Sequence, residues 1–160
     1  MIRISDPKKS LDFYTGLLRM SFLFSMNAGP FTIYFLGHPD RADQSAADIM
    51  KDGTRTGLLE LIHLTTTADD TVGAEWGNAG APQTLGHLGF RVPDVNALLE
   101  RAQLGGHKVL KTVPHIPSTA VGIHEGVGVQ GLHPSFLQGY SQIGFIADPD
   151  GSLTPDQSLR

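Results

Sequence analysis

An internal repeat with an offset of 88 residues constrains the fold of this chain more than any other feature of its sequence. Adding 88 to the first positions brings like residues together: Ile2 with Phe90, Arg3 with Arg91, Ile4 with Val92, Asp6 with Asp94 and Leu11 with Leu99. In both copies a short apolar segment leads to an aspartate, a residue type that caps the N-termini of helices. Each half of the chain is therefore expected to repeat the order strand, helix, strand.

The first copy is expected to form a strand, a helix and three further strands. Its helix begins at Asp6-Pro7, a capping residue followed by proline at the first helical position. The apolar stripe of that helix consists of Leu11, Tyr14, Leu17 and Leu18. Further strands are expected over 20–26, 31–37 and 57–64, and the polar segment 38–55 should be a surface loop with one helical turn at 46–50.

The second copy begins with an expected strand over 85–92, followed by a helix that starts at Asp94. Gly105 is expected to end this helix as a left-handed residue, and 107–113 to form the next strand. The helix stripe consists of Val95, Leu98, Leu99 and Ala102. Segment 115–142 has no counterpart in the first copy and is expected to be a flexible loop. Its glycine pattern at 126–131 resembles a dinucleotide fingerprint, which means little without a strand and a helix around it.

Composition narrows the class of protein. The 160 residues are 40% hydrophobic and 18% charged, which suits one globular domain with a proper core. A net charge of -4 argues against nucleic acids and anionic membranes as partners. Cysteine is absent, so any metal must be held by nitrogen and oxygen. The N-terminal residues lack the pattern of a signal peptide, and we expect a cytoplasmic protein.

Two residues stand out as candidates for chemistry. In the strand over 85–92, alternation places His87, Gly89 and Arg91 on one face, which would line a cleft with an imidazole and a guanidinium. A hydrogen-bonded core histidine is the ordinary alternative. Glu60 lies within an apolar run, where an ionised carboxylate must be paired, metal-bound or neutralised. A surface glutamate on an edge strand is the alternative there. We interpret the pair as half of a metal site.

Five segments resemble glyoxalase I (lactoylglutathione lyase) of the vicinal oxygen chelate superfamily. They are "IRISDPKKSLDFYTGLL", "YFLG", "LLELIH", "GHLGFRVPDV" and "IGFIADPDG", and they occur in the family's order. The resemblance implies an α+β fold of two βαβββ modules, whose curved sheets enclose a cleft. Module one would span about 1–65 and module two about 84–155, with a linker at 66–83, all within a single domain 1–160. It also implies a homodimer with the site shared at the interface.

The same resemblance implies the activity. The family uses zinc or nickel to isomerise the hemithioacetal of methylglyoxal and glutathione to S-lactoylglutathione. Glu60 matches one metal ligand of the family and His87 another. A ligand carboxylate also serves as the catalytic base, and in this chain that role would fall to Glu60. Arg3 matches an arginine that binds the glutamyl carboxylate of glutathione. An arginine that merely solvates its strand is the alternative for Arg3.

The sequence also departs from the family. The first ligand would lie two residues upstream of Met1, and the fourth, a glutamate, falls on Pro155. Two glutathione contacts of the family are replaced by Leu64 and Gln83. Segment 115–142 holds three histidines that could serve as replacement ligands, although their spacing has no structural logic; they are His115, His124 and His133.

Three hypotheses follow from these matches and departures. The chain is an active glyoxalase I, a catalytically weakened member of that family, or a binding module of the same superfamily that works without a metal. The ligand matches favour descent from glyoxalase I. The missing ligands predict impaired chemistry.

Overall fold

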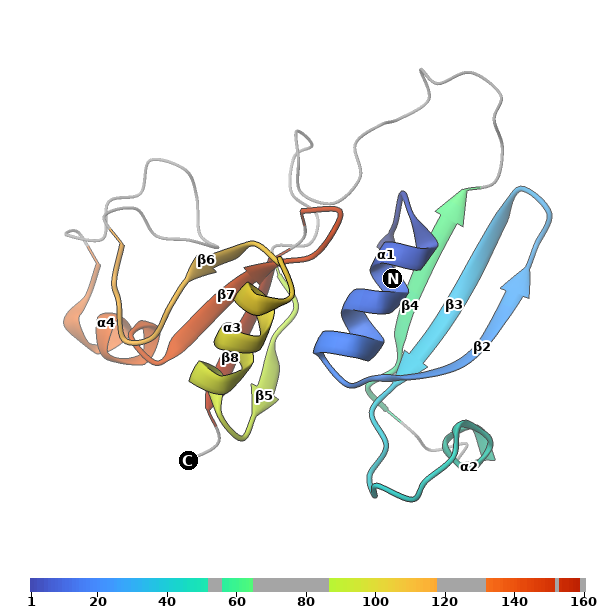
Figure 1. Ribbon diagram of the computed structural model, residues 1–160, viewed down its shortest axis with the longest axis horizontal. Helices are drawn as coiled ribbons and strands as arrows, with labels where there is room; N and C mark the ends of the chain where they lie inside the picture. The colour runs from blue at the N-terminus through green and yellow to red at the C-terminus, as the bar shows by residue number, and fades with distance from the viewer. Residues whose placement is uncertain (52–55, 65–86, 118–131, 152, 159–160) are drawn as a thin grey trace, which may run out of the picture. The chain divides into compact units, whose positions relative to one another are not determined.

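The computed structural model describes residues 1–51, 56–64, 87–117, 132–151 and 153–158, which form two compact units (Figure 1). Unit 1 is Met1–Gly77 and unit 2 is Asn78–Arg160. The elements of unit 1 are β1 (Ile2–Arg3), α1 (Pro7–Leu11), the π-helix η1 (Asp12–Leu17), β2 (Ser21–Asn27), β3 (Phe31–Gly37), α2 (Ala46–Lys51) and β4 (Leu59–Leu64). Those of unit 2 are β5 (Phe90–Val92), α3 (Val95–Leu104), β6 (Val109–Lys111), α4 (Pro134–Tyr140), β7 (Ile143–Ala147) and β8 (Leu153–Ser158). The linker expected at 66–83 lies outside the described residues.

The two units share one sheet topology. Unit 1 has the strand order β1-β4-β3-β2, and unit 2 has the corresponding order β5-β8-β7-β6. In each sheet the first strand pairs in parallel with the last, and the other pairings are antiparallel. The α+β fold of two βαβββ modules is therefore confirmed, and the repeat in the sequence is a repeat of structure.

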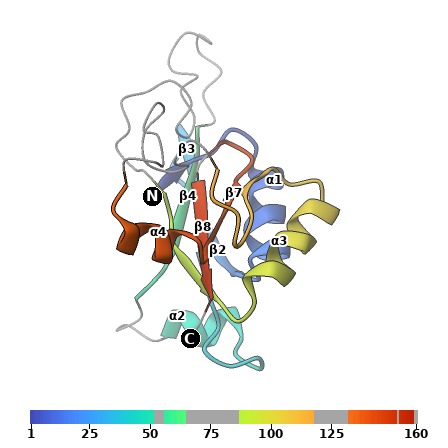
Figure 2. The ribbon, with the colours of Figure 1, turned by 90° about the vertical axis from the view of Figure 1, so that its left-hand side faces the viewer.

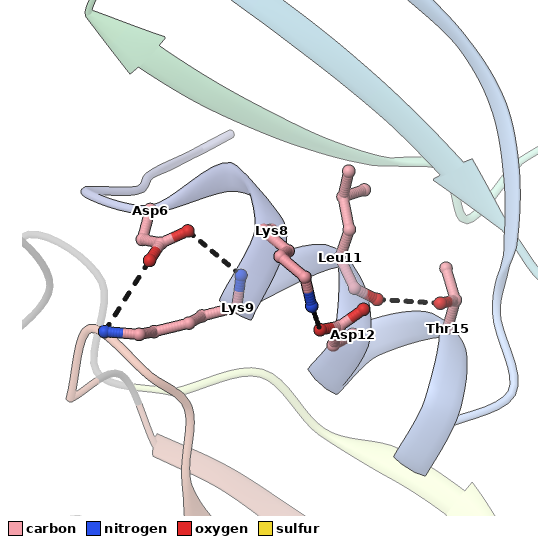
Figure 3. Close-up of polar contacts among 6 residues, drawn as sticks. All are labelled: Asp6, Lys8, Lys9, Leu11, Asp12 and Thr15. Carbon is pink, nitrogen blue, oxygen red and sulfur yellow. Dashed lines mark hydrogen bonds and ion pairs between the residues drawn. The ribbon is translucent and has the colours of Figure 1, made fainter.

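Equivalent aspartates start the main helix of each unit. The Lys9 backbone N–H donates to Asp6 Oδ1 at 3.1 Å, and the Ala97 N–H donates to Asp94 Oδ1 at 3.0 Å (Figure 3 shows the first). Both aspartates have extended backbones, as N-cap residues require. The hydrogen bond from the Lys9 backbone lowers the pKa of Asp6, because it favours the charged carboxylate.

The first helix widens as it proceeds. Over Asp12–Leu17 it is a π-helix, and the Leu18 N–H donates to the Phe13 carbonyl five residues back. Within this segment the adjacent residues Phe13 and Tyr14 are both fully buried. The stripe expected at ordinary helical spacing had included Tyr14 but not Phe13. Thr15 Oγ1 donates to the Leu11 carbonyl within the same turn (Figure 3).

Helix α3 packs on one face of the unit 2 sheet. A Cβ on Gly144 would come within 3.0 Å of Leu99 and 3.2 Å of Val95, so this glycine lets β7 approach the helix closely. The helix ends in a Schellman motif, in which the His107 N–H donates to the Ala102 carbonyl. The left-handed residue there is Gly106, with φ +76°, and not Gly105 as expected.

Helix α4 corrects the expectation of a loop over 115–142. His133 is its N-cap, with the Ser135 N–H donating to His133 Nδ1, and Pro134 occupies the first turn. Proline is favourable there because its missing N–H would have no partner in the helix. His133 therefore caps a helix, while 118–131, with His124 and the glycine pattern, lies outside the described residues. Figure 2 shows α3 and α4 on opposite sides of β7 and β8.

The Asp94 cap provides a test of the fold. Asp94→Ala removes the acceptor for the Ala97 N–H and should lower the free energy of unfolding by about 0.5–2 kcal/mol. Asp94→Asn keeps an acceptor and should cost far less. Chemical denaturation of the three proteins measures the difference, and equal losses in both variants would contradict the capping role.

Candidate functional site

Glu60 lies on the face of the unit 1 sheet that points away from the helix. Along β4, Leu59 and Leu61 are buried in the core, while Glu60 is half-buried on the opposite face. Its neighbour in register is Phe35, which is stacked on Phe24 with ring centroids 4.4 Å apart. The carboxylate therefore stands beside an aromatic surface of low polarity. We call this the open face of the sheet.

Arg3 shares the open face with Glu60. It is exposed, and it is the register partner of Ile62, which lies two residues beyond Glu60 on the same side of β4. No carboxylate in the described part of the chain forms an ion pair with Arg3. Unit 1 thus places two of the three predicted site residues, Glu60 and Arg3, on the same face of its sheet.

His87 is the third predicted residue, and it belongs to unit 2. Its exposed imidazole meets Phe145 edge-to-face, with centroids 6.4 Å apart. Phe145 follows Gly144, which faces α3, so Phe145 and His87 lie on the side of the sheet opposite that helix. As in unit 1 we call the side opposite the main helix the open face, although in unit 2 helix α4 covers part of it, with Tyr140 lying against Phe145. The shared role of His87 and Glu60 as metal ligands stays a prediction.

The sheet register identifies Pro155 as the counterpart of Glu60. In unit 1 the β1 residue Ile2 is opposite Leu61, and in unit 2 its repeat partner Phe90 is opposite Asp156. One residue earlier on the last strand is Glu60 in the first sheet and Pro155 in the second. The position that the motif resemblance predicts for a fourth ligand is thus also identified by the sheet register, and a proline occupies it.

Lys111 is a feature of the open face that the sequence did not reveal. It stands opposite Phe145, where unit 1 has Phe24 opposite Phe35, and it is 2% exposed. Lys111 Nζ donates to the Ile143 carbonyl at 2.6 Å and lies 4.7 Å from the centre of the Tyr140 ring. Burial lowers the pKa of this amine.

The Lys111 contacts attach α4 to the open face. Tyr140 is 3% exposed and lies against Phe145 with centroids 5.9 Å apart, and it also stacks with Phe136. Phe145, whose ring contacts His87, therefore packs against Tyr140, and the buried amine of Lys111 lies against the Tyr140 ring. In the sequence, Lys111 is a lysine within the apolar "KVLKTV" segment. That pattern fits a solvent-exposed strand residue as well as a buried one.

The donor atoms suit a divalent cation. Glu60 supplies carboxylate oxygen and His87 imidazole nitrogen, the combination that zinc and nickel accept in the absence of cysteine. Among the described residues, neither side chain forms a hydrogen bond or an ion pair. In those same ranges no three His, Asp or Glu side chains cluster closely enough to hold a metal. No helix there is long and apolar enough to cross a membrane.

Solved structures share the fold of this chain. The trypanothione-dependent glyoxalase I of Leishmania major superposes with a TM-score of 0.57 at 18% identity, over 99% of this chain and 82% of that one. TnmS3, an antibiotic binding protein from Streptomyces, gives 0.51 at 16% identity, over 99% and 91%. Residues 1–154 match the Glyoxalase/Bleomycin resistance protein/Dioxygenase superfamily, and the chain belongs to this family.

Relatives within the family are similar over most of this chain. The lactoylglutathione lyase of Pseudomonas aeruginosa is 31% identical over 159 residues, covering 94% of this chain and 75% of the enzyme. That of Pseudomonas putida is 35% identical over 106 residues, covering 63% and 61%. Glyoxalase I of Saccharomyces cerevisiae is 29% identical, covering 94% and 39%. The chain thus spans between two fifths and three quarters of these proteins, and the resemblance read from its motifs is confirmed.

Burial of Lys111 predicts that the free energy of unfolding depends on pH. Because its folded pKa is lowered below the ordinary value of 10.5, the unfolded chain binds more protons between those two pKa values. The contribution of Lys111 to the free energy of unfolding should therefore rise with pH across that window. Lys111→Met removes this contribution, so the difference between wild type and variant should grow as pH increases toward about 10.5. Denaturation curves of both proteins measure it, with exposed Lys108→Met as the control; a difference that stays constant would contradict the assignment.

Proposed function

We propose that this chain is a lactoylglutathione lyase that isomerises the methylglyoxal–glutathione hemithioacetal to S-lactoylglutathione, with chemistry weakened by an incomplete ligand set. The main support is the placement of Glu60 beside Arg3 on an open, apolar sheet face, in a chain whose relatives are named lactoylglutathione lyases. His87 on the open face of unit 2 adds a second donor atom. Glu60 and His87 are the proposed metal ligands.

Glu60 is also the proposed catalytic base. The reaction removes a proton from the carbon that carries the hydroxyl and the sulfur, and returns a proton to the neighbouring carbonyl carbon. The Glu60 carboxylate has no partner among the described residues, so it is available to accept and return that proton. The Phe35 side chain beside Glu60 would reduce the access of water to the carboxylate, so that the proton is exchanged with the substrate and not with solvent. A bound zinc or nickel ion would supply Lewis acidity to the substrate oxygens.

Arg3 is the proposed anchor for the glutathione part of the substrate. A guanidinium binds a carboxylate through two parallel hydrogen bonds, which fixes orientation as well as position. Such binding, remote from the reacting carbons, would hold the substrate in the orientation that the reaction needs. We further propose a cytoplasmic homodimer, without nucleic-acid or membrane partners, in keeping with the net charge of -4.

Pro155 favours a second candidate function. A proline in the register position of Glu60 leaves the second sheet without its carboxylate, which weakens metal binding and removes a second base. With this loss the protein would act as a metal-poor or inactive binding module of the same superfamily. The metal content of the purified protein, together with turnover, separates the two functions.

Metal binding tests Glu60 and His87 directly. Glu60→Gln and His87→Ala should each weaken zinc or nickel binding by about tenfold or more in calorimetric titration, since each removes a donor atom. Glu100→Gln, on the exposed face of α3, is the control for lost charge. His115→Ala tests the replacement-ligand alternative. A tight, stoichiometric site that survives His87→Ala would rule out His87 as a ligand.

Pro155→Glu tests the proposed defect. The change supplies a carboxylate at the position of Glu60 and a backbone N–H to β8, which has neighbouring strands on both sides. Turnover of the hemithioacetal should rise by about 10²–10⁴-fold, the contribution of a positioned base. Steady-state kinetics with metal content checked measures this, and Pro155→Gln controls for the backbone. An unmodified chain already as fast as Pro155→Glu would show that other ligands complete the site.

A further inference from the structure

We propose that Lys111 is a positioning residue for His87, acting through the aromatic rings of Tyr140 and Phe145. The proposal rests on the function proposed above, in which His87 is a metal ligand, and it concerns unit 2 alone. Lys111 lies outside both family motifs of unit 2, "GHLGFRVPDV" and "IGFIADPDG". Helix α4, which carries Tyr140, lies within the segment 115–142 that has no counterpart in the first copy of the repeat.

The His87 imidazole depends on Phe145 for its orientation. Within the described ranges His87 forms no hydrogen bond or ion pair, and it meets the Phe145 ring edge-to-face. A Cβ placed on Gly89, two residues further along, would meet nothing within 4 Å, so the space beside the strand is open. An exposed side chain without polar partners keeps its rotamer freedom unless a neighbouring group restricts it. The Phe145 ring is in the position to do so.

Phe145 is in turn supported by helix α4. Tyr140, the last residue of that helix, lies against Phe145 with ring centroids 5.9 Å apart, and both residues are buried. The support in unit 1 is different, because the equivalent ring, Phe35, stacks on Phe24 of the neighbouring strand. In unit 2 the position of Phe24 is occupied by Lys111. The ring that packs on Phe145 therefore comes from α4 and not from the sheet.

Lys111 attaches the end of α4 to the sheet. Its Nζ lies 4.7 Å from the centre of the Tyr140 ring and donates to the Ile143 carbonyl at 2.6 Å. These two contacts lie on either side of the turn that connects α4 to β7. Lys111 is 2% exposed, and such partners offset the cost of burying an amine. Loss of the amine should therefore loosen Tyr140, and with it the ring that orients His87.

NMR of the imidazole protons tests the proposal without a metal. The His87 signals are identified by their loss in His87→Ala, and all spectra are taken at one alkaline pH, at which histidine side chains are neutral. In Lys111→Met and in Tyr140→Leu the His87 signals should shift, because the Phe145 ring no longer keeps its place beside the imidazole. Tyr140→Phe keeps the ring and should leave the His87 signals near their wild-type positions.

Asp94→Ala is the control for lost stability. It removes the cap of α3, which packs on the face of the sheet opposite His87, and should leave the His87 signals unchanged. Unchanged signals in Lys111→Met, or an equal shift in Asp94→Ala, would show that Lys111 only stabilises unit 2, and the proposal would be wrong. Thermal unfolding verifies that each variant is folded. If Lys111→Met does not fold, Tyr140→Leu and Tyr140→Phe decide: equal His87 signals in these two variants would overturn the proposal.

Zinc titration of the same variants connects the proposal to the proposed function. Lys111→Met and Tyr140→Leu should each weaken zinc binding by about tenfold, the lower end of the effect of residues that support a metal ligand, and Tyr140→Phe should bind zinc as the wild type does. Equal zinc affinity in the wild type and Lys111→Met would contradict the positioning role. A wild type that binds no zinc would overturn the metal role of His87, while the NMR comparison would still decide whether Lys111 positions its ring.

Discussion

The parallel pairing of the first strand with the last in each unit is the constraint on which the rest of the structure depends. β1 is two residues long and β5 is three, yet their pairing with β4 and β8 places Arg3 opposite Ile62 and Phe90 opposite Asp156. A slip of β4 by one residue against β3 would send Glu60 to the helix side of its sheet. Parallel neighbours need a long connection, and the helix within it covers one face of each sheet, while in unit 2 helix α4 also packs on part of the other face.

The open faces are where the two units differ. Unit 1 has a stacked pair, Phe24 on Phe35, in the place where unit 2 sets Lys111 against Phe145. The Lys111 amine donates to a main-chain carbonyl and lies against an aromatic ring, and these two interactions offset the cost of burying its charge. Unit 1 has a phenylalanine at the equivalent position. The two units thus share one topology while the chemistry of their open faces differs.

Much of this organisation could be predicted from local sequence. Asp6 and Asp94 identified the starts of both helices, because a capping aspartate acts within three residues of itself. Local rules failed where a pattern has two meanings. Gly105-Gly106 offers two glycines for one left-handed position, and His133-Pro134 suits a loop as well as the first turn of a helix. Phe13 was missed because the expected stripe took only Tyr14 from that turn, although two adjacent helical residues can both face a core.

The sequence by itself determined the repeat, the order of strands and helices in the first unit, the family and the residue types suited to metal and carboxylate binding, but not helix α4. Those properties depend on composition and on neighbours along the chain. Only the tertiary structure decided that Arg3 shares a face with Glu60, that Pro155 occupies the register position of Glu60, and that Lys111 is buried beneath Tyr140. These relations join residues from distant parts of the chain, and strand register and packing fix them together.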